Sequence, residues 1–221
     1  MSKTPVTEVC LIQLKGPYKL KDSSTPEGAN WASSISTLKK CPGFQDIYTS
    51  SVVEDRTKAR MFLNWDCKED HFAFYDTPHF PAFRARLLSL CAIPPIPIHV
   101  LFHPAHPKTL EAPVTEVVMA YFPLSITTQQ KEKWESTWQT FVTEVGKEAK
   151  GVLDAHGGWV IEGMQVEGGE GEMKAWMGTV GWEGLEAQKA FREREAVGGV
   201  MALLDEVDGV LKGENYLVEL S

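Results

Sequence analysis

The sequence lacks most of the patterns that mark a common functional site. Its four cysteines all fall in the first half without CxxC spacing, which argues against a zinc site. No segment approaches the roughly 20 apolar residues that span a bilayer. No GxSxG nucleophile motif and no glycine-rich phosphate loop after a strand are found. With 22 Lys and Arg against 30 Asp and Glu, the chain has a net charge of -8, which argues against a nucleic-acid partner.

The remaining composition is that of a globular protein. Hydrophobic residues make up 43% and charged residues 24% of the 221 residues, enough to bury a substantial core. The first residues lack the apolar core of a signal peptide. Four thiols without such a signal predict reduced cysteines in a cytoplasmic protein. His103 and His106 stand beside prolines, so no metal site is predicted from them.

An internal repeat is the most informative feature of the chain. The sequence PVTEV stands at 5–9 and again at 113–117, each time opening an apolar run that reads as a strand. Further on, a strand ends in a Trp-acid pair, at 65–66 and again at 182–183. The same features in the same order predict two copies of one small α+β unit.

Hydrophobic periodicity gives the order of elements in the first half. Trp31, Ile35 and Leu38 form one apolar stripe on a helix that follows a polar loop. A second helix begins after Asp66, is interrupted near Pro78 and Pro81, and resumes at 82–90. The predicted strands are 6–14, 47–54, 58–65 and 96–102. This β-α-β-β-α-β order is ferredoxin-like.

The second half repeats this order with clearer sequence signals. A helix over 128–152 carries the apolar stripe Trp134, Trp138, Phe141 and Val145, and we expect Gly157 and Gly158 to end it. A glycine-rich turn at 168–171 predicts a hairpin. The further predicted helices are 183–195 and 197–211. The predicted strands are 114–122, 159–166, 173–182 and 215–220.

These patterns predict an α+β fold of two ferredoxin-like repeats. We expect a first repeat at 1–105, a linker at 106–112 and a second repeat at 113–221. The first strands of both repeats are apolar on both faces, which is typical of strands buried on both sides. Packing the two sheets face to face would form an intramolecular α+β barrel, whose interior is either filled or hollow. Further pairing into a homodimer stays open.

One segment of the first half carries a family resemblance. Its residues are Trp65 and Asp66, a helix through His71, Phe74 and Tyr75, the sequence TPHF at 77–80, and Phe83. The segment resembles the antibiotic-biosynthesis-monooxygenase (ABM) type of the dimeric α+β barrel superfamily. That resemblance implies a cofactor-free site inside the barrel for a small apolar or aromatic molecule. The superfamily also includes polyketide cyclases, isomerases, dehalogenase-like and haem-degrading enzymes and stress proteins, so the reaction stays open.

Four residues are the candidate catalytic groups: His79, Asn64, Tyr75 and His99. His79, the histidine of the resemblance, titrates near neutrality and could move a proton, or could only cap the broken helix. Asn64 and Tyr75 could stabilise an oxyanion. His99 stands within an apolar strand, where it is either a hydrogen-bonded core residue or a perturbed functional group.

The two copies differ at three of these positions. Aligned on the Trp-acid pair, the second copy has Ala196, Gly181 and Arg192 where the first has His79, Asn64 and Tyr75. The shared scaffold therefore does not require these polar groups. This asymmetry predicts a single site in the first half, on the third strand and the broken helix.

Five further residues are candidates for binding the substrate: Trp65, Phe62, Tyr121, Gln13 and Arg84. Strand alternation puts Phe62 and Asn64 on one face and Met61, Leu63 and Trp65 on the other, so Asn64 and Trp65 cannot both face one cavity. Core packing is the alternative role for Trp65. Arg84 either binds an anionic oxygen or lies on a solvated helix face.

Two functions are compatible with these residues. The first is a cofactor-free enzyme that tailors an aromatic or polyketide-like molecule by monooxygenation, or by cyclisation or isomerisation through an enolate or phenolate. The second is a binding or stress-response protein without catalysis. A cavity of roughly 300 Å³ or more with convergent polar groups would favour the enzyme.

Overall fold

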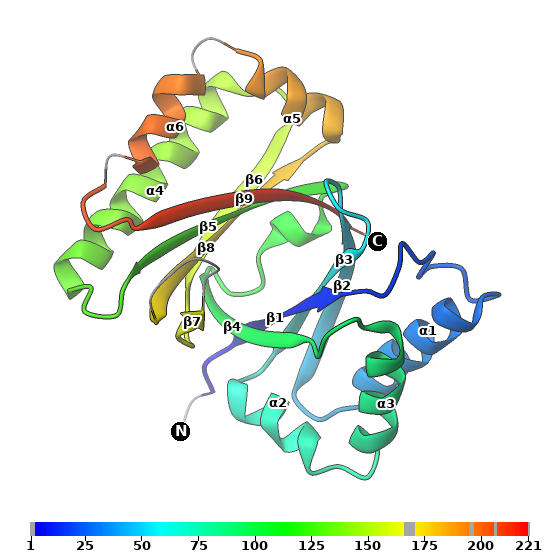
Figure 1. The fold of residues 1–221 in the computed structure, drawn as a ribbon. Helices are drawn as coiled ribbons and strands as arrows, with labels where there is room; N and C mark the ends of the chain where they lie inside the picture. Colours follow the sequence, from blue (N-terminus) through cyan, green and yellow to red (C-terminus); the bar gives the residue numbers. More distant parts are fainter. Residues whose placement is uncertain (1–2, 166–170, 195–196, 206, 221) are drawn as a thin grey trace. The chain divides into compact units, whose positions relative to one another are not determined.

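A computed structural model describes residues 3–165, 171–194, 197–205 and 207–220 (Figure 1). The chain divides into two compact units. The first unit runs to His106 and also includes the end of the chain from Val218, and the second runs from Pro107 to Leu217. The predicted second repeat included the whole C-terminus, whereas the last residues of the final strand pair with the first unit.

The first unit is a sheet with helices packed on one face (Figure 1). Its helices are α1 Pro26–Leu38, α2 Lys68–Tyr75 and α3 Phe80–Leu90. Its strands are β1 Val6–Gln13, β2 Phe44–Val52, β3 Lys58–Trp65 and β4 Ile96–His103. The strands pair antiparallel in the order β2-β3-β1-β4. The last strand of the chain is β9, Lys212–Leu220. Its C-terminal end pairs with β2, with Val218 opposite Val52.

Local sequence explains where the helices of the first unit begin and end. Thr25 caps α1, because its hydroxyl accepts a hydrogen bond from the Gly28 N–H, and Pro26 suits the first helical position. The predicted interruption of the second helix separates α2 from α3 at residues 76–79. There the Thr77 hydroxyl donates to the Phe74 carbonyl at 2.8 Å and satisfies an acceptor at the end of α2.

The second unit has a similar succession of elements, with one short strand added. Its strands are β5 Val114–Pro123, β6 Val152–Val160, β7 Met164–Gln165, β8 Glu172–Trp182 and most of β9. Its helices are η1 Lys108–Glu111, α4 Thr128–Glu148, α5 Leu185–Arg192 and α6 Val197–Asp205. β5 lies between β9 and β8, and both β6 and β7 pair with the other edge of β8. None of the described helices is both long and apolar enough to cross a bilayer.

The second unit differs from its prediction in two places. Gly157 and Gly158 lie inside β6 and do not end α4, which stops at Glu148. A Cβ at Gly157 would lie 2.3 Å from the ring of Trp176, so the glycine is needed where that indole packs against the strand. The predicted linker is partly helical, and Thr109 within it is fully buried. Three of the four residues of the predicted glycine-rich turn, 168–170, lie outside the described ranges.

The core of the second unit is built on the predicted aromatic stripe. Trp134, Trp138, Phe141 and Val145 of α4 are all buried. Trp138 stacks on Phe141, with ring centroids 5.2 Å apart. The Thr127–Gln130 capping box fixes the start of this helix, so the stripe meets the sheet in one register.

Replacing Trp138 with Ala should therefore lower the free energy of unfolding by about 3–5 kcal/mol, through lost burial and the cavity left behind. Chemical denaturation followed by circular dichroism measures this difference. The exposed Thr140 on the same helix provides a matched control, and Thr140→Ala should change stability by less than about 0.5 kcal/mol. Equal stability of the Trp138 variant and the wild type would contradict the burial of the stripe.

Candidate functional site

A cavity of about 240 Å³ lies in the first unit, between its sheet and its helices. Strand β3 contributes Met61 and Leu63 to the wall, and α2 and α3 contribute the aromatic side chains. A site inside a barrel was predicted, whereas this cavity lies on the helix-covered face of one sheet. Its volume is slightly below the expected threshold of roughly 300 Å³, which favours a compact ligand.

Most of the cavity wall is apolar and aromatic. Phe74, Phe80 and Phe83 line it, and the ring of Phe74 makes edge-to-face contacts with the other two at centroid distances of 5.3 and 5.1 Å. Such pairs hold their rings in preferred orientations. The polar groups on the wall are few, namely Glu8, Cys10, His71, Tyr75 and Arg84.

Glu8 is a carboxylate buried within an apolar strand. Its side chain lies on the cavity face of β1, directly across from Leu63 of β3 and His99 of β4. The indole N–H of Trp65 donates to Glu8 Oε2 at 3.0 Å, and His71 Nε2 lies 3.4 Å from the same oxygen. A buried carboxylate needs such partners, because burying it alone would be very costly.

His71 joins Glu8 to a second buried histidine. His71 Nδ1 and His99 Nε2 are 2.8 Å apart, and both side chains are almost completely buried. The His71 ring also stacks on Trp65, with centroids 5.3 Å apart, and meets Tyr75 edge to face. The carboxylate and the two imidazoles therefore form a continuous polar chain, which begins at the cavity wall.

Two other polar groups on the wall stay protonated at neutral pH. Loss of hydration and the negative charge of Glu8 raise the pKa of Tyr75 to about 12. Burial raises the pKa of the Cys10 thiol well above its ordinary value. Tyr75 can therefore donate a hydrogen bond to a ligand oxygen, while Cys10 lacks the thiolate character of a nucleophile.

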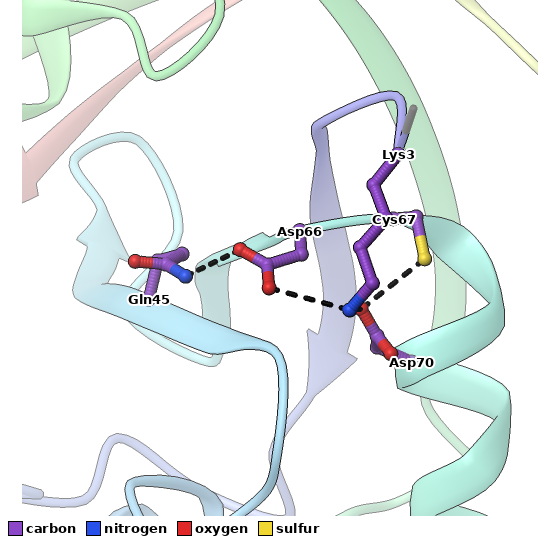
Figure 2. A network of polar contacts seen from close by, with 5 residues as sticks. All are labelled: Lys3, Gln45, Asp66, Cys67 and Asp70. Carbon is purple, nitrogen blue, oxygen red and sulfur yellow. Dashed lines mark hydrogen bonds and ion pairs between the residues drawn. The ribbon is translucent and has the colours of Figure 1, made fainter. Parts of the chain in front are cut away.

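A surface network fixes the start of α2 and with it the position of His71. Figure 2 shows Lys3 reaching both Asp66 and Asp70, with Nζ–Oδ2 distances of 3.4 and 2.8 Å. Gln45 donates to Asp66, and the Cys67 thiol donates to Asp70 at 3.1 Å. Because Asp70 immediately precedes His71, these contacts hold the first turn of α2 in place.

Four of the predicted site residues meet at this cavity. Tyr75 and Arg84 line it. His99 and Trp65 do not line the cavity but contact residues that do, His71 and Glu8 respectively. As alternation predicts, Trp65 lies on the opposite face of β3 from Asn64. Trp65 is fully buried, and its indole N–H has a polar partner as well.

Five predicted residues lie elsewhere. Asn64 accepts a hydrogen bond from the Thr7 hydroxyl at 2.8 Å, on the face of the sheet away from the cavity. Phe62 and Gln13 share that face, and Gln13 donates to Thr57 Oγ1 at 2.8 Å. Tyr121 belongs to the second unit, where its hydroxyl donates to Glu214. His79 is the exposed N-cap residue of α3 and is not part of the cavity wall.

Glu8 was not among the predicted site residues. Two signals were available: a carboxylate in the middle of an apolar strand, and alternation that places it on the same face as Val6 and Cys10. Glu8 also recurs as Glu116 in the second copy of the repeat. His71 was considered only as a residue of the broken helix.

The second copy contains the same buried glutamate with different partners. Glu116, which corresponds to Glu8, forms an ion pair with Arg192 and accepts a hydrogen bond from Asn215 Nδ2 at 2.9 Å. Gln188 Nε2 lies 3.4 Å from its other oxygen. Aligned on the Trp-acid pair, Gln188 and Arg192 stand at the positions of His71 and Tyr75. A permanently charged guanidinium thus neutralises Glu116.

Comparison with known proteins adds a fold and no sequence relative. No family model matches the chain, and no curated protein matches it by sequence. An anthrone oxidase-like protein of known structure is 16% identical, with 99% of this chain and 92% of that chain aligned at a TM-score of 0.63. A proposed monooxygenase from Fusobacterium nucleatum is 10% identical, with 100% and 94% of the chains aligned at a TM-score of 0.62. Another from Lactobacillus acidophilus, also 10% identical, aligns over 99% and 94% at 0.59.

The chain resembles these three solved proteins in fold. This confirms the predicted resemblance, and the alignments extend over both units. At such low identities the likeness concerns the fold alone. Within the described ranges, no three His, Cys, Asp or Glu side chains are grouped so that they could hold a metal ion.

The Lys3–Asp70 contact gives a pH-dependent prediction. The hydrogen bond from Lys3 holds the pKa of Asp70 below its usual value. The carboxylate therefore stabilises the folded state at pH values above the unfolded-state pKa of about 3.9. This stabilisation is lost as the pH falls through the lower pKa of the folded state. Asp70→Asn should therefore lower Tm at pH 7, and the difference should vanish in acid. Thermal melts from pH 7 to below pH 3 measure it.

Asp76, exposed at the other end of α2, is the matched control. Asp76→Asn removes a negative charge from a helix C-terminus and should leave Tm at pH 7 unchanged or slightly higher. A deficit of the Asp70 variant that stays the same at all pH values would show that the ion pair does not stabilise α2.

Proposed function

We propose that the first-unit cavity is the active site of a cofactor-independent enzyme that acts on an aromatic or polyketide-like small molecule. The observation that carries the proposal is the buried Glu8–His71 pair on the wall of an aromatic cavity. A carboxylate in a dry, apolar site is a stronger base than one in water. It is suited to remove a proton from a phenol or from carbon beside a carbonyl, which leaves a phenolate or enolate.

The neighbouring groups have separate tasks in this proposal. Tyr75, a protonated phenol, donates a hydrogen bond to the oxygen that gains charge as the proton leaves. Phe74, Phe80 and Phe83 hold the substrate ring and exclude water. Arg84 is exposed at the cavity and is placed to attract an anionic substituent.

Oxygenation is the favoured second step. An enolate can react with O2 so that a ring methylene becomes a carbonyl: two C–H bonds break, one oxygen atom forms the carbonyl, and the other leaves as water with both hydrogens. The names of the aligned structures, an anthrone oxidase-like protein and two proposed monooxygenases, support this choice. The cavity of about 240 Å³ favours a compact ring system over an extended chain. Cyclisation or isomerisation through the same anion needs no O2.

A non-catalytic binding or stress-response protein is the alternative. It would use the same aromatic wall to capture a ligand, with Glu8 and His71 as hydrogen-bonding groups only. One measurement distinguishes the two functions. An anthrone or hydroquinone probe would quench the tryptophan fluorescence of a binding protein, but no product would form.

We also propose that the two units are ferredoxin-like repeats packed sheet to sheet within one chain. The supporting observation is that successive residues of β1 and β5 are buried, so both faces of each strand are covered. A compact chain of this length has a radius of gyration of about 17 Å. Small-angle scattering should give that value for a monomer, whereas two non-touching domains would give a clearly larger one. Light scattering on the same sample tests for a homodimer.

Glu8→Gln is the decisive variant for the enzyme. The amide keeps the shape of the side chain but cannot accept a proton, so kcat should fall by about 10²–10⁴-fold while the probe still binds. Product absorbance and O2 uptake measure turnover, fluorescence quenching measures binding, and circular dichroism checks the fold. A folded variant that loses less than ten-fold would remove Glu8 from the mechanism.

Two further variants complete the comparison. Glu116→Gln makes the same change in the second unit and should lower Tm but not turnover, because Arg192 loses its charged partner.

His79→Ala tests the histidine of the family resemblance. Because His79 is exposed and outside the cavity wall, we expect a loss below ten-fold. A loss of 10²-fold or more would instead assign the acid–base role to His79.

A further inference from the structure

The contact between His71 and His99 restricts where their protons lie. At 2.8 Å, a hydrogen bond between His71 Nδ1 and His99 Nε2 requires one nitrogen to donate and the other to accept. The other ring nitrogen of His71 faces Glu8 Oε2 at 3.4 Å. A lone pair directed at a carboxylate would be repelled, so His71 Nε2 must carry its hydrogen.

For a neutral His71, this assignment fixes the direction of the whole chain. With its hydrogen on Nε2, a neutral His71 presents a lone pair at Nδ1, and His99 Nε2 must then be the donor. The hydrogens therefore all point the same way, from His99 to His71 and from His71 to Glu8. The indole N–H of Trp65 also points at Glu8 Oε2, at 3.0 Å.

We propose that His99 is a positioning residue that holds His71 in its Nε2–H tautomer, and so keeps Glu8 hydrogen-bonded as the base. The inference rests on the proposed function, which gives Glu8 its task. His99 acts only through His71, and it is not among the residues that line the cavity. Its near-complete burial on β4, directly across from Glu8, fixes its ring.

The second unit provides an internal comparison that supports this role. It buries the equivalent carboxylate, Glu116, with Arg192, Gln188 and Asn215, and uses no histidine among these partners. The fold can therefore accommodate a buried glutamate at this position without imidazoles. In the first unit the buried carboxylate instead has an imidazole and an indole N–H beside it.

Two substitutions at His99 separate positioning from packing. His99→Gln retains an amide N–H close to the position of the ring Nε2 and should preserve the tautomer of His71. His99→Phe retains the ring shape but has no donor. We expect kcat to fall at least ten-fold in the Phe variant, with KM little changed, and to remain within a few-fold of the wild type in the Gln variant. Equal loss in both variants would show that His99 only packs.

Nitrogen-15 NMR of the histidine rings gives a readout that does not depend on turnover. In the wild type, His71 should show a protonated Nε2 and an unprotonated, hydrogen-bonded Nδ1. The Gln variant should keep this pattern, and the Phe variant should lose the Nδ1 hydrogen bond. The Nδ1–H tautomer of His71 in the wild type would overturn the proposal, even if the Phe variant does not fold.

The same experiment separates failure of this inference from failure of the proposed function. If the wild type turns over none of the anthrone or hydroquinone probes but shows the expected tautomer, the enzyme proposal loses its support while the role of His99 in fixing His71 holds. If the wild type is active and the Phe variant retains full kcat, the positioning role is wrong and the enzyme proposal stands.

Discussion

The buried carboxylate of Glu8 is the constraint on which the rest of the first unit depends. An ionised carboxylate in an apolar strand is tolerated only if fixed donors replace its water. β3 supplies one donor through Trp65, and α2 supplies the other through His71. The start of α2, tied to β2 and the N-terminus by the Lys3 and Gln45 contacts, therefore sets the environment of a group on β1. Packing and electrostatics at this site cannot be separated.

The two copies of the repeat solve the same burial problem in different ways. In the second, Arg192 extends from α5 and pairs with Glu116, while Trp182 Nε1 has no hydrogen-bond partner among the residues described. In the first, Tyr75 takes the place of that arginine, and the carboxylate relies on an indole and an imidazole. An arginine stabilises the charged form of a carboxylate and so lowers its basicity, which makes Glu116 the weaker candidate for a base.

The sequence predicted the elements of the fold better than the site. Repeats and hydrophobic periodicity identified the strands and helices of the first half, and strand alternation separated Trp65 from Asn64 correctly. The comparison of copies was less reliable, because a difference can have a structural cause. A Cβ at Gly181, the counterpart of Asn64, would lie 3.0 Å from the side chain of Ala112. In the first copy Asn64 accepts a hydrogen bond from Thr7, whereas in the second the Thr109 carbonyl accepts the hydrogen bond of the corresponding Thr115. That asymmetry reflects linker packing, which local sequence patterns do not reveal.

Glu8 was not predicted as a site residue, whereas His79 was, because only His79 differs between the two copies. A residue shared by both copies looks like scaffold, yet what distinguishes Glu8 is its partners, and these come from strands and helices more than 50 residues away in the chain. A glutamate kept in both copies can therefore be structural in one and chemically available in the other. Its function depends on its nearest donors, which are an imidazole and an indole in the first copy and a guanidinium in the second. These donors set how readily the carboxylate accepts a proton from a ligand.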